Sequence, residues 1–436
     1  MQVFCLIIVK EPMRFLIVYV CSLFSITAFS QTGKTLYFQP NFANGSSVSK
    51  FYDEVNYIPL QTTRKSLFGR IRQLLVSDKY FIIWDADTNS IYFFDKTGKF
   101  LKKYRPPKCV IKSIQLDEAR NAIFITGSNK NYRFSQAEIE KMMEDPTNTK
   151  FARFSWSGYY NLEDIYKEDV KEIKHFSLAL ATPTIFDANS WAYSYIYANK
   201  KWDDLTDYEL KIYNERTTTN QYFPYNKRNS SIYLQSQQVR FFPTPQNDFL
   251  FVRPFYYSIY KLNKDSVSLL YTLIMPMENS LPKSFYEYPF KTKNEIQTYR
   301  DNNGSIVWTL YNLYKYNNYL FFSLDYKKNF RDRNFMYDES SGKFFNIGKI
   351  SPDSTNAFLP IASNIQYCDG NYLYSSISSS SMFQTKDNTQ QRNPEYTPAL
   401  KQYFENSNRE ANPVIIQLKP KKKIGLASRL LFSKYC

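Results

Sequence analysis

Short strands rich in aromatic and β-branched residues recur along this chain, and their recurrence limits the possible folds more than any other feature. Within residues 71–104, Gly98 lies where a tight hairpin needs a positive φ. Four consecutive antiparallel strands form a meander, which is the unit of a β-propeller blade. The four predicted strands of this stretch are Ile71–Ser77, Tyr80–Trp84, Ser90–Asp95 and Phe100–Tyr104.

The unit recurs through the rest of the chain. The repeat is about 55–65 residues, longer than the roughly 40–50 residues of common propeller blades because loops are inserted. The sequence therefore predicts an all-β fold with one domain over residues 31–419, a six-bladed β-propeller of four-stranded antiparallel blades. The further groups of predicted strands fall within residues 111–165, 176–222, 238–274, 306–347 and 361–418.

Several segments interrupt the strand pattern. Gln136–Glu144 is rich in Ala, Glu, Lys and Met, which favour helix, and predicts a small helical insertion in a blade loop. Trp156–Gly158 and Ser340–Gly342 predict hairpin turns. Ser375–Asn393, rich in Ser, Gln and Asn, is predicted to be a mobile loop.

The two ends of the predicted propeller are expected to meet. A propeller must join its first and last blades, since two open sheet edges would otherwise be exposed. Val55–Leu60 is therefore expected to add an outer strand to the blade that Pro413–Leu418 completes.

Composition narrows the chemistry that the chain can perform. The 436 residues include 38 Tyr, 36 Phe and 5 Trp, but only 5 Cys and a single His, His175. Zinc sites draw on Cys and His, and general acid–base catalysis most often uses His. No Ser, Cys or carboxylate pattern of a catalytic triad lies beside His175. We expect no metal and no cofactor, so an enzyme would depend on carboxylates, Lys, Tyr or Ser.

Acidic motifs give weak signals. Asp85–Asn89 is similar to the first half of a calcium loop, but Ser90 replaces the required glycine and Lys96 replaces the closing glutamate. A turn between two blade strands is the better interpretation. Asp203 and Asp204 could in principle act as a carboxylate pair in glycoside cleavage, but their polar, lysine-rich surroundings favour a solvated loop.

The formal net charge of +16 is spread along the chain, with one local excess at the end. Basic and acidic residues mostly alternate along the predicted strands, and no basic stripe or recognition motif is visible, so nucleic-acid binding is not expected. The basic tail 420–436 is interpreted as a frayed terminus, with contact to a membrane surface as the alternative.

Four segments of the chain resemble a known family. Glu54–Thr63, Asp85–Phe100, Phe251–Leu262 and Asn412–Lys419 are similar to the opening, middle and closing strands of six-bladed β-propeller proteins exported by Bacteroidetes-type bacteria, a family related to NHL-type propellers. The resemblance covers residues 34–419. Tyr257 departs from the family pattern, because relatives commonly have Asp at this position. Since family members mostly have no assigned activity, the resemblance implies architecture and export rather than a function.

Residues 1–30 are predicted to be a secretory signal peptide. The apolar run Phe15–Phe24 follows a basic residue, and small residues precede a cut between Ser30 and Gln31. The run is shorter than the about 20 apolar residues that span a membrane. Met13 is an alternative start, because a basic residue follows it directly. We therefore expect a chain without a transmembrane helix in the periplasm or at the cell surface.

The cysteines predict neither a lipid anchor nor a disulfide framework. Val20 precedes Cys21 where a bacterial lipobox has a small residue, so lipidation is not expected. Of the cysteines left after export, Cys109 and Cys368 are interpreted as buried thiols or as one bridge, and Cys436 is unpaired in either case.

Aromatic residues are the main resource for binding. Trp156, Trp202, Tyr256 and Tyr257 are the candidate ligand-binding residues, as platforms for stacking; the alternative is that such rings pack blade against blade. The leading hypothesis is a non-catalytic binding or scaffold module for a glycan, peptide or protein partner. The rival is an exported carbohydrate-active hydrolase or lyase with carboxylate or Tyr chemistry. At the mouth of the channel, an enzyme should cluster carboxylates, or Tyr with Lys or Arg, whereas a binding module should show mainly aromatic and amide groups.

Overall fold

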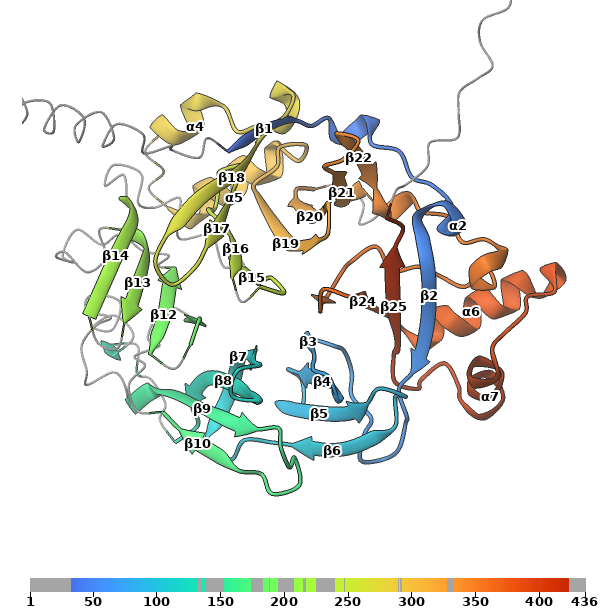
Figure 1. The fold of residues 1–436 in the computed structure, drawn as a ribbon. Coiled ribbons are helices and arrows are strands. Elements are labelled where there is room, and N and C mark those ends of the chain that lie inside the picture. Colours follow the sequence, from blue (N-terminus) through green and yellow to red (C-terminus); the bar gives the residue numbers. More distant parts are fainter. Residues whose placement is uncertain are drawn as a thin grey trace, which may run out of the picture.

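The chain folds into a ring of six β-sheets, as the sequence predicts (Figure 1). Five sheets have four antiparallel strands, and the sheet of blade 4 gains a fifth strand from the N-terminal segment. This computed structural model describes residues 33–131, 135, 137–138, 153–173, 183–187, 189–194, 208–214, 217–224, 240–246, 248–288, 290, 292–327 and 332–422.

The blades follow one another in chain order. Blade 1 contains β3 (Gln73–Val76), β4 (Tyr80–Asp85), β5 (Ser90–Asp95) and β6 (Phe100–Tyr104). Blade 2 contains β7 (Cys109–Asp117), β8 (Ala122–Asn129), β9 (Ser155–Asn161) and β10 (Val170–Glu172). Blade 3 contains β11 (Thr184–Ile185), β12 (Ser190–Ser194), β13 (Tyr208–Asn214) and β14 (Thr217–Pro224).

The second half of the ring takes strands from both ends of the chain. Blade 4 contains β15 (Phe241–Pro243), β16 (Phe249–Val252), β17 (Ser258–Leu262), β18 (Val267–Ile274) and β1 (Lys34–Tyr37). Blade 5 contains β19 (Thr309–Tyr316), β20 (Tyr319–Asp325), β21 (Asn334–Asp338) and β22 (Lys343–Asn346). Blade 6 contains β23 (Tyr367–Cys368), β24 (Leu373–Ile377), β25 (Val414–Pro420) and β2 (Tyr52–Pro59).

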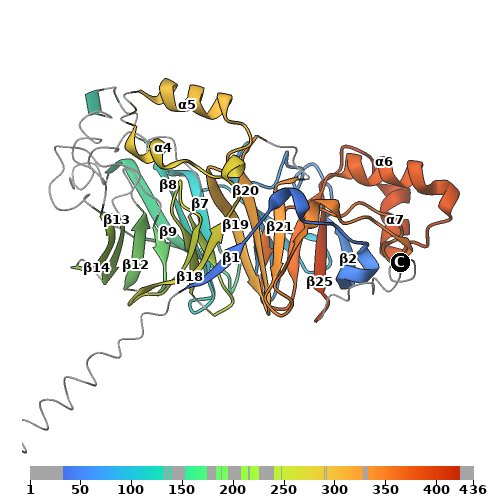
Figure 2. The same ribbon diagram turned by 90° about the horizontal axis from the view of Figure 1, so that it is seen from above.

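Each sheet has two different ends. Because neighbouring strands are antiparallel, the turn between the first and second strands and the turn between the third and fourth strands lie at one end, which we call the hairpin end. The other connections leave the opposite end, which we call the helix end. Figure 2 shows helices of the insertions together on one side of the ring: α4 (Lys283–Glu287), α5 (Lys293–Asn302) and α6 (Ser379–Thr389).

The ring closes as the sequence predicts. β2 pairs with β25 in antiparallel register, with Val55 opposite Leu418 and Ile58 opposite Ile415. The N-terminal segment thus supplies the outer strand of the blade that the C-terminal segment completes, so no open edge remains between the first and last blades.

The segment before β2 also binds two further blades, which the sequence does not predict. β1 pairs in parallel with β18, with Leu36 opposite Leu273. Asn44 then forms a bridge with Phe345 of blade 5. Between these contacts Phe38 is completely buried among aromatic rings of blade 5. Residues 34–59 therefore form a strap over blades 4, 5 and 6.

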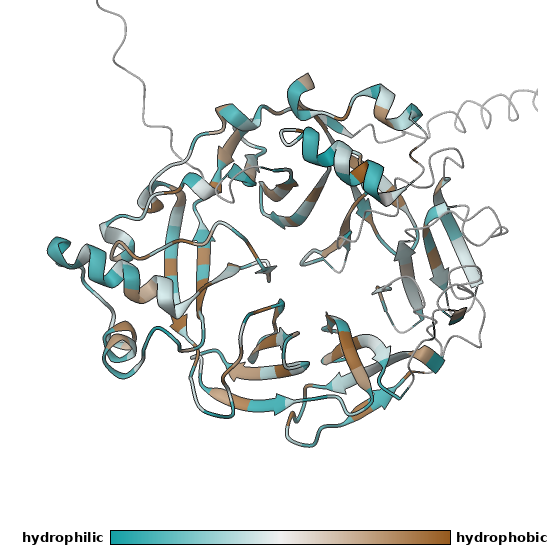
Figure 3. Ribbon diagram, turned by 180° about the vertical axis from the view of Figure 1, so that it is seen from behind, coloured by the Kyte–Doolittle hydropathy of each residue, from teal (hydrophilic) through white to brown (hydrophobic). Residues whose placement is uncertain are grey.

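Aromatic rings fill the spaces between blades. Phe93 of blade 1 stacks on Tyr160 of blade 2 with ring centroids 5.3 Å apart, and Phe81 of blade 1 meets Tyr374 of blade 6 at 5.9 Å. Figure 3 shows hydrophobic residues on strands of the ring, alternating with hydrophilic ones. Many of the aromatic rings in the described part of the chain thus serve packing, since such rings bury large apolar areas.

Two local predictions are wrong. Trp156–Gly158 is not a turn but part of β9, where Gly158 pairs with Ile125. Ser375–Asn393 is not a loop, because β24 continues to Ile377 and α6 follows. The side chain of Ser378 caps α6 by accepting a hydrogen bond from the backbone N–H of Ser381.

Further helices lie outside the predicted helical insertion. Most of Gln136–Glu144 lies outside the described residues. The longer helices that the structure describes are α4 and α5, between blades 4 and 5, and α6 and α7 (Pro398–Asn406), within blade 6. The shorter helical turns are η1 (Pro40–Phe42), α2 (Val48–Phe51), η4 (Met277–Asn279), η6 (Ile347–Lys349), η7 (Ser354–Asn356) and η8 (Gln390–Arg392).

Candidate functional site

The segment between β18 and β19, residues 275–308, forms an insertion at the helix end of blades 4 and 5 that we call the α4–α5 insertion (Figure 2). α5 begins after Thr292, whose side chain accepts a hydrogen bond from the backbone N–H of Glu295. The insertion has its own apolar core, separate from the blade cores. This core contains Phe255, Leu281, Phe285, Phe290, Ile296, Ile306 and Trp308.

Tyr257, one of the predicted ligand-binding residues, ties both ends of this insertion together. Its hydroxyl donates a hydrogen bond to the carbonyl of Val307 at 2.7 Å and accepts one from the backbone N–H of Leu281 at 2.8 Å. Burial raises the pKa of the Tyr257 hydroxyl well above its ordinary value. The side chain therefore positions the insertion, and its hydroxyl is already engaged.

Tyr256 lies beside the same insertion. The guanidinium of Arg253 stacks on the Tyr256 ring at 3.9 Å and on the Phe223 ring at 4.4 Å. Arg253 also donates two hydrogen bonds, at 2.7 and 3.1 Å, to the completely buried carboxylate of Glu209. The Tyr256 ring lies 5.7 Å from the ring of Tyr286 in α4. A buried ion pair of blades 3 and 4 thus holds Tyr256 against the α4–α5 insertion.

A cavity of about 530 Å³ opens between α4 and α5, and we call it the α4–α5 pocket. Phe285 and Phe290, which are 1% and 5% exposed, contribute buried rings, whereas Tyr288 remains 54% exposed. The rings of Tyr288 and Phe290 meet at 4.7 Å. Hydroxyl, amide and carboxylate groups complete the lining, from Ser284, Thr292, Asn294, Glu295, Thr298 and Asn302. The pocket therefore combines aromatic rings with amide, hydroxyl and carboxylate groups, at a place other than the channel mouth where the sequence predicts ligand contacts.

Carboxylates gather at the hairpin end of the ring, opposite the end that carries the α4–α5 insertion. Asp78, Glu118 and Asp369 each lie in the turn after the first strand of a blade, in blades 1, 2 and 6. Because the first strands are the innermost strands of the ring, these three turns lie near its centre at the hairpin end, a place that we call the channel mouth (Figure 1). Lys96 reaches the same place, where its Nζ donates a hydrogen bond to the Ser77 carbonyl at 2.9 Å.

Electrostatic coupling links these groups. Partial desolvation raises the pKa of Glu118, although the residue is exposed to water, and the negative charges of Asp78 and Asp369 raise it further. Burial lowers the pKa of Lys96, and the same two carboxylates oppose this effect. Burial, followed by the charges of Glu118 and Asp369, raises the pKa of Tyr367. The mouth therefore shows the carboxylate, Tyr and Lys arrangement expected of an enzyme.

Asp369, however, is occupied by structural hydrogen bonds. One carboxylate oxygen accepts from the backbone N–H groups of Asn371 and Tyr372 at 2.8 and 2.7 Å. The other oxygen accepts from the Tyr374 hydroxyl at 2.6 Å. Among the described residues, no three His, Cys, Asp or Glu side chains lie where they could hold a metal ion.

The remaining predicted residues fall into two groups. Trp156 lies in β9 and is 6% exposed, within the core cluster shared by blades 1, 2 and 6, so its ring is part of the blade packing. Trp202, His175, Asp203, Asp204 and the predicted cleavage site at Ser30 and Gln31 lie outside the described residues.

The structure tests the interpretation of the acidic motif Asp85–Asn89 and the two alternatives for Cys109 and Cys368. Asp85–Asn89 forms the turn between β4 and β5, as predicted, and the buried Asp85 carboxylate accepts a hydrogen bond from the Thr88 hydroxyl at 2.7 Å. Cys109 and Cys368 are both buried free thiols, so the alternative of one bridge between them is wrong.

Comparison with known proteins agrees with this architecture. Residues 35–419 match the family described as Domain of unknown function (DUF4934). The chain belongs to this family. It is similar to a protein from Bacteroides fragilis NCTC 9343 that is described as exported, with 13% identity, a TM-score of 0.58, and coverage of 89% of this chain and 100% of that chain. At this identity the likeness shows the fold alone.

Other solved structures are less similar. A member of the DUF4221 family from Bacteroides vulgatus ATCC 8482 has 10% identity and a TM-score of 0.39, covering 85% of this chain and 97% of that chain. An oligogalacturonate lyase in complex with manganese has 10% identity and a TM-score of 0.36, covering 82% and 79%. Similarity at these TM-scores indicates nothing about function. No curated protein matches the sequence. No helix in the described part of this DUF4934 chain is long and apolar enough to cross a membrane.

Sequence reasoning missed the residues of the α4–α5 pocket. The signal was present, since four of the six residues in the stretch 285–290 are aromatic. The carboxylates of the channel mouth also had a signal, because Asp78, Glu118 and Asp369 all follow the first strand of a repeat. Each pattern can be assigned to a place in the fold only when the boundaries of the blades are known.

Proposed function

We propose that this protein is exported and acts as a non-catalytic binding module, and that the α4–α5 pocket holds an apolar side chain of a peptide or protein partner. The observation that carries the proposal is the pocket itself: two buried phenyl rings, Phe285 and Phe290, beside a Tyr288 ring that remains 54% exposed. Exposed rings next to a cavity are typical anchor points of binding surfaces.

The lining favours a peptide for physical reasons. Burial of one apolar side chain contributes about 1.5–3 kcal/mol, which alone gives only weak binding. The amides of Asn294 and Asn302 and the hydroxyl of Thr298 border the same pocket and can hydrogen-bond to a peptide backbone. An apolar anchor flanked by such groups matches the usual arrangement of an apolar centre and a polar rim.

The export part of the proposal has separate support. Residues 1–30 have the pattern of a signal peptide, and the Bacteroides fragilis protein with the same fold is described as exported. Cell fractionation tests it, with the N-terminal sequence of the mature protein as the readout. We expect a chain that begins at Gln31 in the periplasm or at the cell surface, and a full-length chain in the cytoplasm would contradict export.

A peptide array and a glycan array, both probed with the protein of residues 31–436, test the binding role. We expect peptides with a central aromatic or aliphatic residue to bind, and hydrogen exchange in residues 283–302 to slow in their presence. Binding of glycans alone with protection of the same segment would show that the pocket takes sugars. Binding on neither array would count against the proposed function.

The channel mouth supports a second candidate function, a carbohydrate-active hydrolase or lyase. A raised carboxyl pKa, as at Glu118, makes the carboxyl hold its proton more readily than an ordinary glutamate, as a general acid must. An assay of polysaccharide cleavage with the parent protein and Glu118→Gln tests this candidate. Cleavage that disappears in Glu118→Gln would support the enzyme, and absence of cleavage in the parent would remove it.

A further inference from the structure

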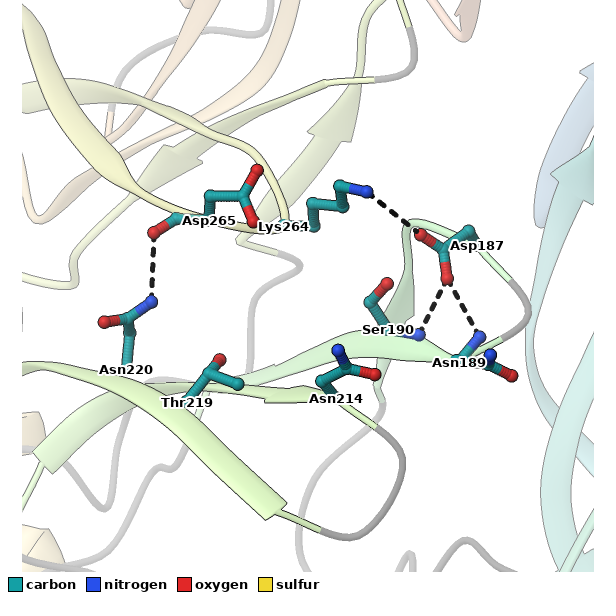
Figure 4. A pocket seen from close by; sticks show the side chains of 8 residues that line it. All are labelled: Asp187, Asn189, Ser190, Asn214, Thr219, Asn220, Lys264 and Asp265. Atoms are coloured by element: carbon teal, nitrogen blue, oxygen red, sulfur yellow. Dashed lines mark hydrogen bonds and ion pairs between the residues drawn. The ribbon is translucent and has the colours of Figure 1, made fainter.

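A polar cleft of about 250 Å³ lies at the junction of blades 3 and 4 (Figure 4). Its walls come from the β11–β12 turn and β13–β14 hairpin of blade 3, and from the β17–β18 turn of blade 4. These turns lie at the hairpin ends of the sheets, whereas the α4–α5 insertion leaves the helix end of blade 4. The polar cleft is therefore separate from the α4–α5 pocket.

Two polar contacts cross the junction between these walls. The Nζ of Lys264 in blade 4 lies 4.0 Å from a carboxylate oxygen of Asp187 in blade 3. The side-chain amide of Asn220 in blade 3 donates a hydrogen bond to the Asp265 carbonyl of blade 4 at 3.0 Å. The other Asp187 oxygen accepts two backbone hydrogen bonds of its own turn, both at 2.9 Å. The cleft is thus built by specific polar contacts between two blades.

The lining is polar throughout. Its eight described side chains are three amides, two hydroxyls, two carboxylates and one ammonium group. Figure 4 shows the side chains of Asn214 and Thr219 pointing from blade 3 toward Lys264 and Asp265. The Asp265 carboxylate makes no hydrogen bond or ion pair with the described residues. Both donors and acceptors therefore face the same small volume.

The chemistry of the lining selects its ligand. None of the described lining residues is aromatic or has an aliphatic hydrocarbon side chain. An apolar ligand would therefore remove water from the polar groups of the cleft without forming hydrogen bonds in return. A ligand dense in hydroxyl groups can use the amides as both donors and acceptors, and the carboxylates as paired acceptors. The volume lies below the roughly 300–1,000 Å³ of sites for drug-sized ligands, so it suits one small unit.

We propose that this cleft binds a single sugar unit, free or at the end of a glycan, and that the protein therefore has a second ligand site on blades 3 and 4. The two carboxylates and one lysine give the lining a net negative charge. A neutral or amino sugar is accordingly favoured over a uronic acid, whose carboxylate would be repelled. This site is independent of the α4–α5 pocket and its proposed peptide ligand.

Titration calorimetry and saturation-transfer NMR of the protein of residues 31–436 with glucose, galactose, glucosamine and galacturonic acid test the proposal. The test variant is Asn214→Ala/Asp265→Ala, because neither side chain forms a hydrogen bond or ion pair with the described residues. Its unfolding midpoint is compared with that of the parent. Tyr288→Ala is the control, since it alters only the α4–α5 pocket.

We expect saturable binding of at least one neutral or amino sugar, weakened about tenfold or more in Asn214→Ala/Asp265→Ala and unchanged in Tyr288→Ala. Failure of all four sugars to bind would overturn the proposal, as would equal affinity of the parent and the double variant or binding of galacturonic acid alone. Because Tyr288→Ala leaves this cleft intact, loss of sugar binding in that variant alone would likewise overturn it. Failure of peptide binding leaves these outcomes unaffected, so the two proposals are tested separately.

Discussion

The hydroxyl of Tyr257 lies 2.7 Å from the carbonyl oxygen of Val307, and this hydrogen bond joins the residue just before the third strand of blade 4 to the segment that enters blade 5. The same hydroxyl accepts a hydrogen bond from Leu281, at the other end of the α4–α5 insertion. One phenol group therefore fixes both ends of the segment that carries the pocket.

Replacing Tyr257 by Phe should loosen this insertion. The change leaves the Leu281 N–H and the Val307 carbonyl without this partner, which costs about 1–3 kcal/mol of unfolding free energy. Denaturant unfolding measures the loss, and hydrogen exchange should speed up at residues 277–308. Tyr37→Phe is the matched control, since Tyr37 is 78% exposed. Equal stability of the two variants would show that Tyr257 does not clamp the insertion.

Phe38 should contribute strongly to the strap over blades 4, 5 and 6. It is completely buried, and its ring centroid lies 4.5 Å from that of Phe344 and 5.0 Å from that of Phe335. Phe38→Ala should lower the unfolding free energy by about 3–5 kcal/mol. Phe42→Ala, four residues away and 77% exposed, should change it by less than about 0.5 kcal/mol. Similar losses in both variants would argue against the strap.

Ala substitutions in two glycine turns distinguish the cost of backbone strain from the cost of a steric clash. Gly98 and Gly342 have φ values of +87° and +68°, so Ala in either turn costs about 1–2 kcal/mol. A Cβ on Gly98 would also lie 2.2 Å from the Pro59 carbonyl oxygen of the closing strand, whereas nothing lies within 4 Å at Gly342. Gly98→Ala should therefore lose about 2–5 kcal/mol in total. Thermal and denaturant unfolding of the two variants measures the difference, and a smaller loss for Gly98→Ala would contradict this account of ring closure.

The carboxylates of the channel mouth predict a pH dependence. The pKa of Glu118 is raised above its ordinary value of 4.5, so the folded protein holds this proton at a pH where the unfolded chain has released it. Stability from this group is therefore present below about pH 4.5 and declines as the pH rises through the raised pKa. Glu118→Gln should be more stable than the parent at pH 7, by less than about 1 kcal/mol because the side chain is exposed to water. The gain should vanish at pH 4, and a gain that is the same at both pH values would contradict the coupling.

The sequence predicts the architecture well for two reasons. Strands are visible as local patterns of residues, and every propeller must avoid open sheet edges. Together these two considerations predict the pairing of β2 with β25. The parallel pairing of β1 with β18 does not, because the four residues Lys34–Tyr37 carry no pattern that selects a distant partner. α6 was missed because its Ser and Asn residues favour loops, while the buried Met382 packs against α7 and stabilises the helix.

The candidate site was harder to predict than the fold. Tyr256 and Tyr257 indicated the right region, but the structure gives Tyr257 an internal hydrogen-bonding role. The pocket depends on how two short helices pack over a blade end, which no periodic pattern encodes. Tyr288 lies beyond the end of α4, where propensity alone distinguishes neither an exposed ring nor a buried one.

The affinity of an array-selected peptide for the parent, Tyr288→Ala and Tyr166→Ala proteins tests the central claim most directly. Tyr166 is the matched control, since it is 61% exposed but lies in blade 2, away from the insertion. We predict that Tyr288→Ala weakens binding by about 10- to 100-fold, as for a central aromatic anchor, with its unfolding midpoint unchanged. Tyr166→Ala should bind like the parent. Equal affinity of Tyr288→Ala and the parent would contradict the assignment of the α4–α5 pocket as the ligand site.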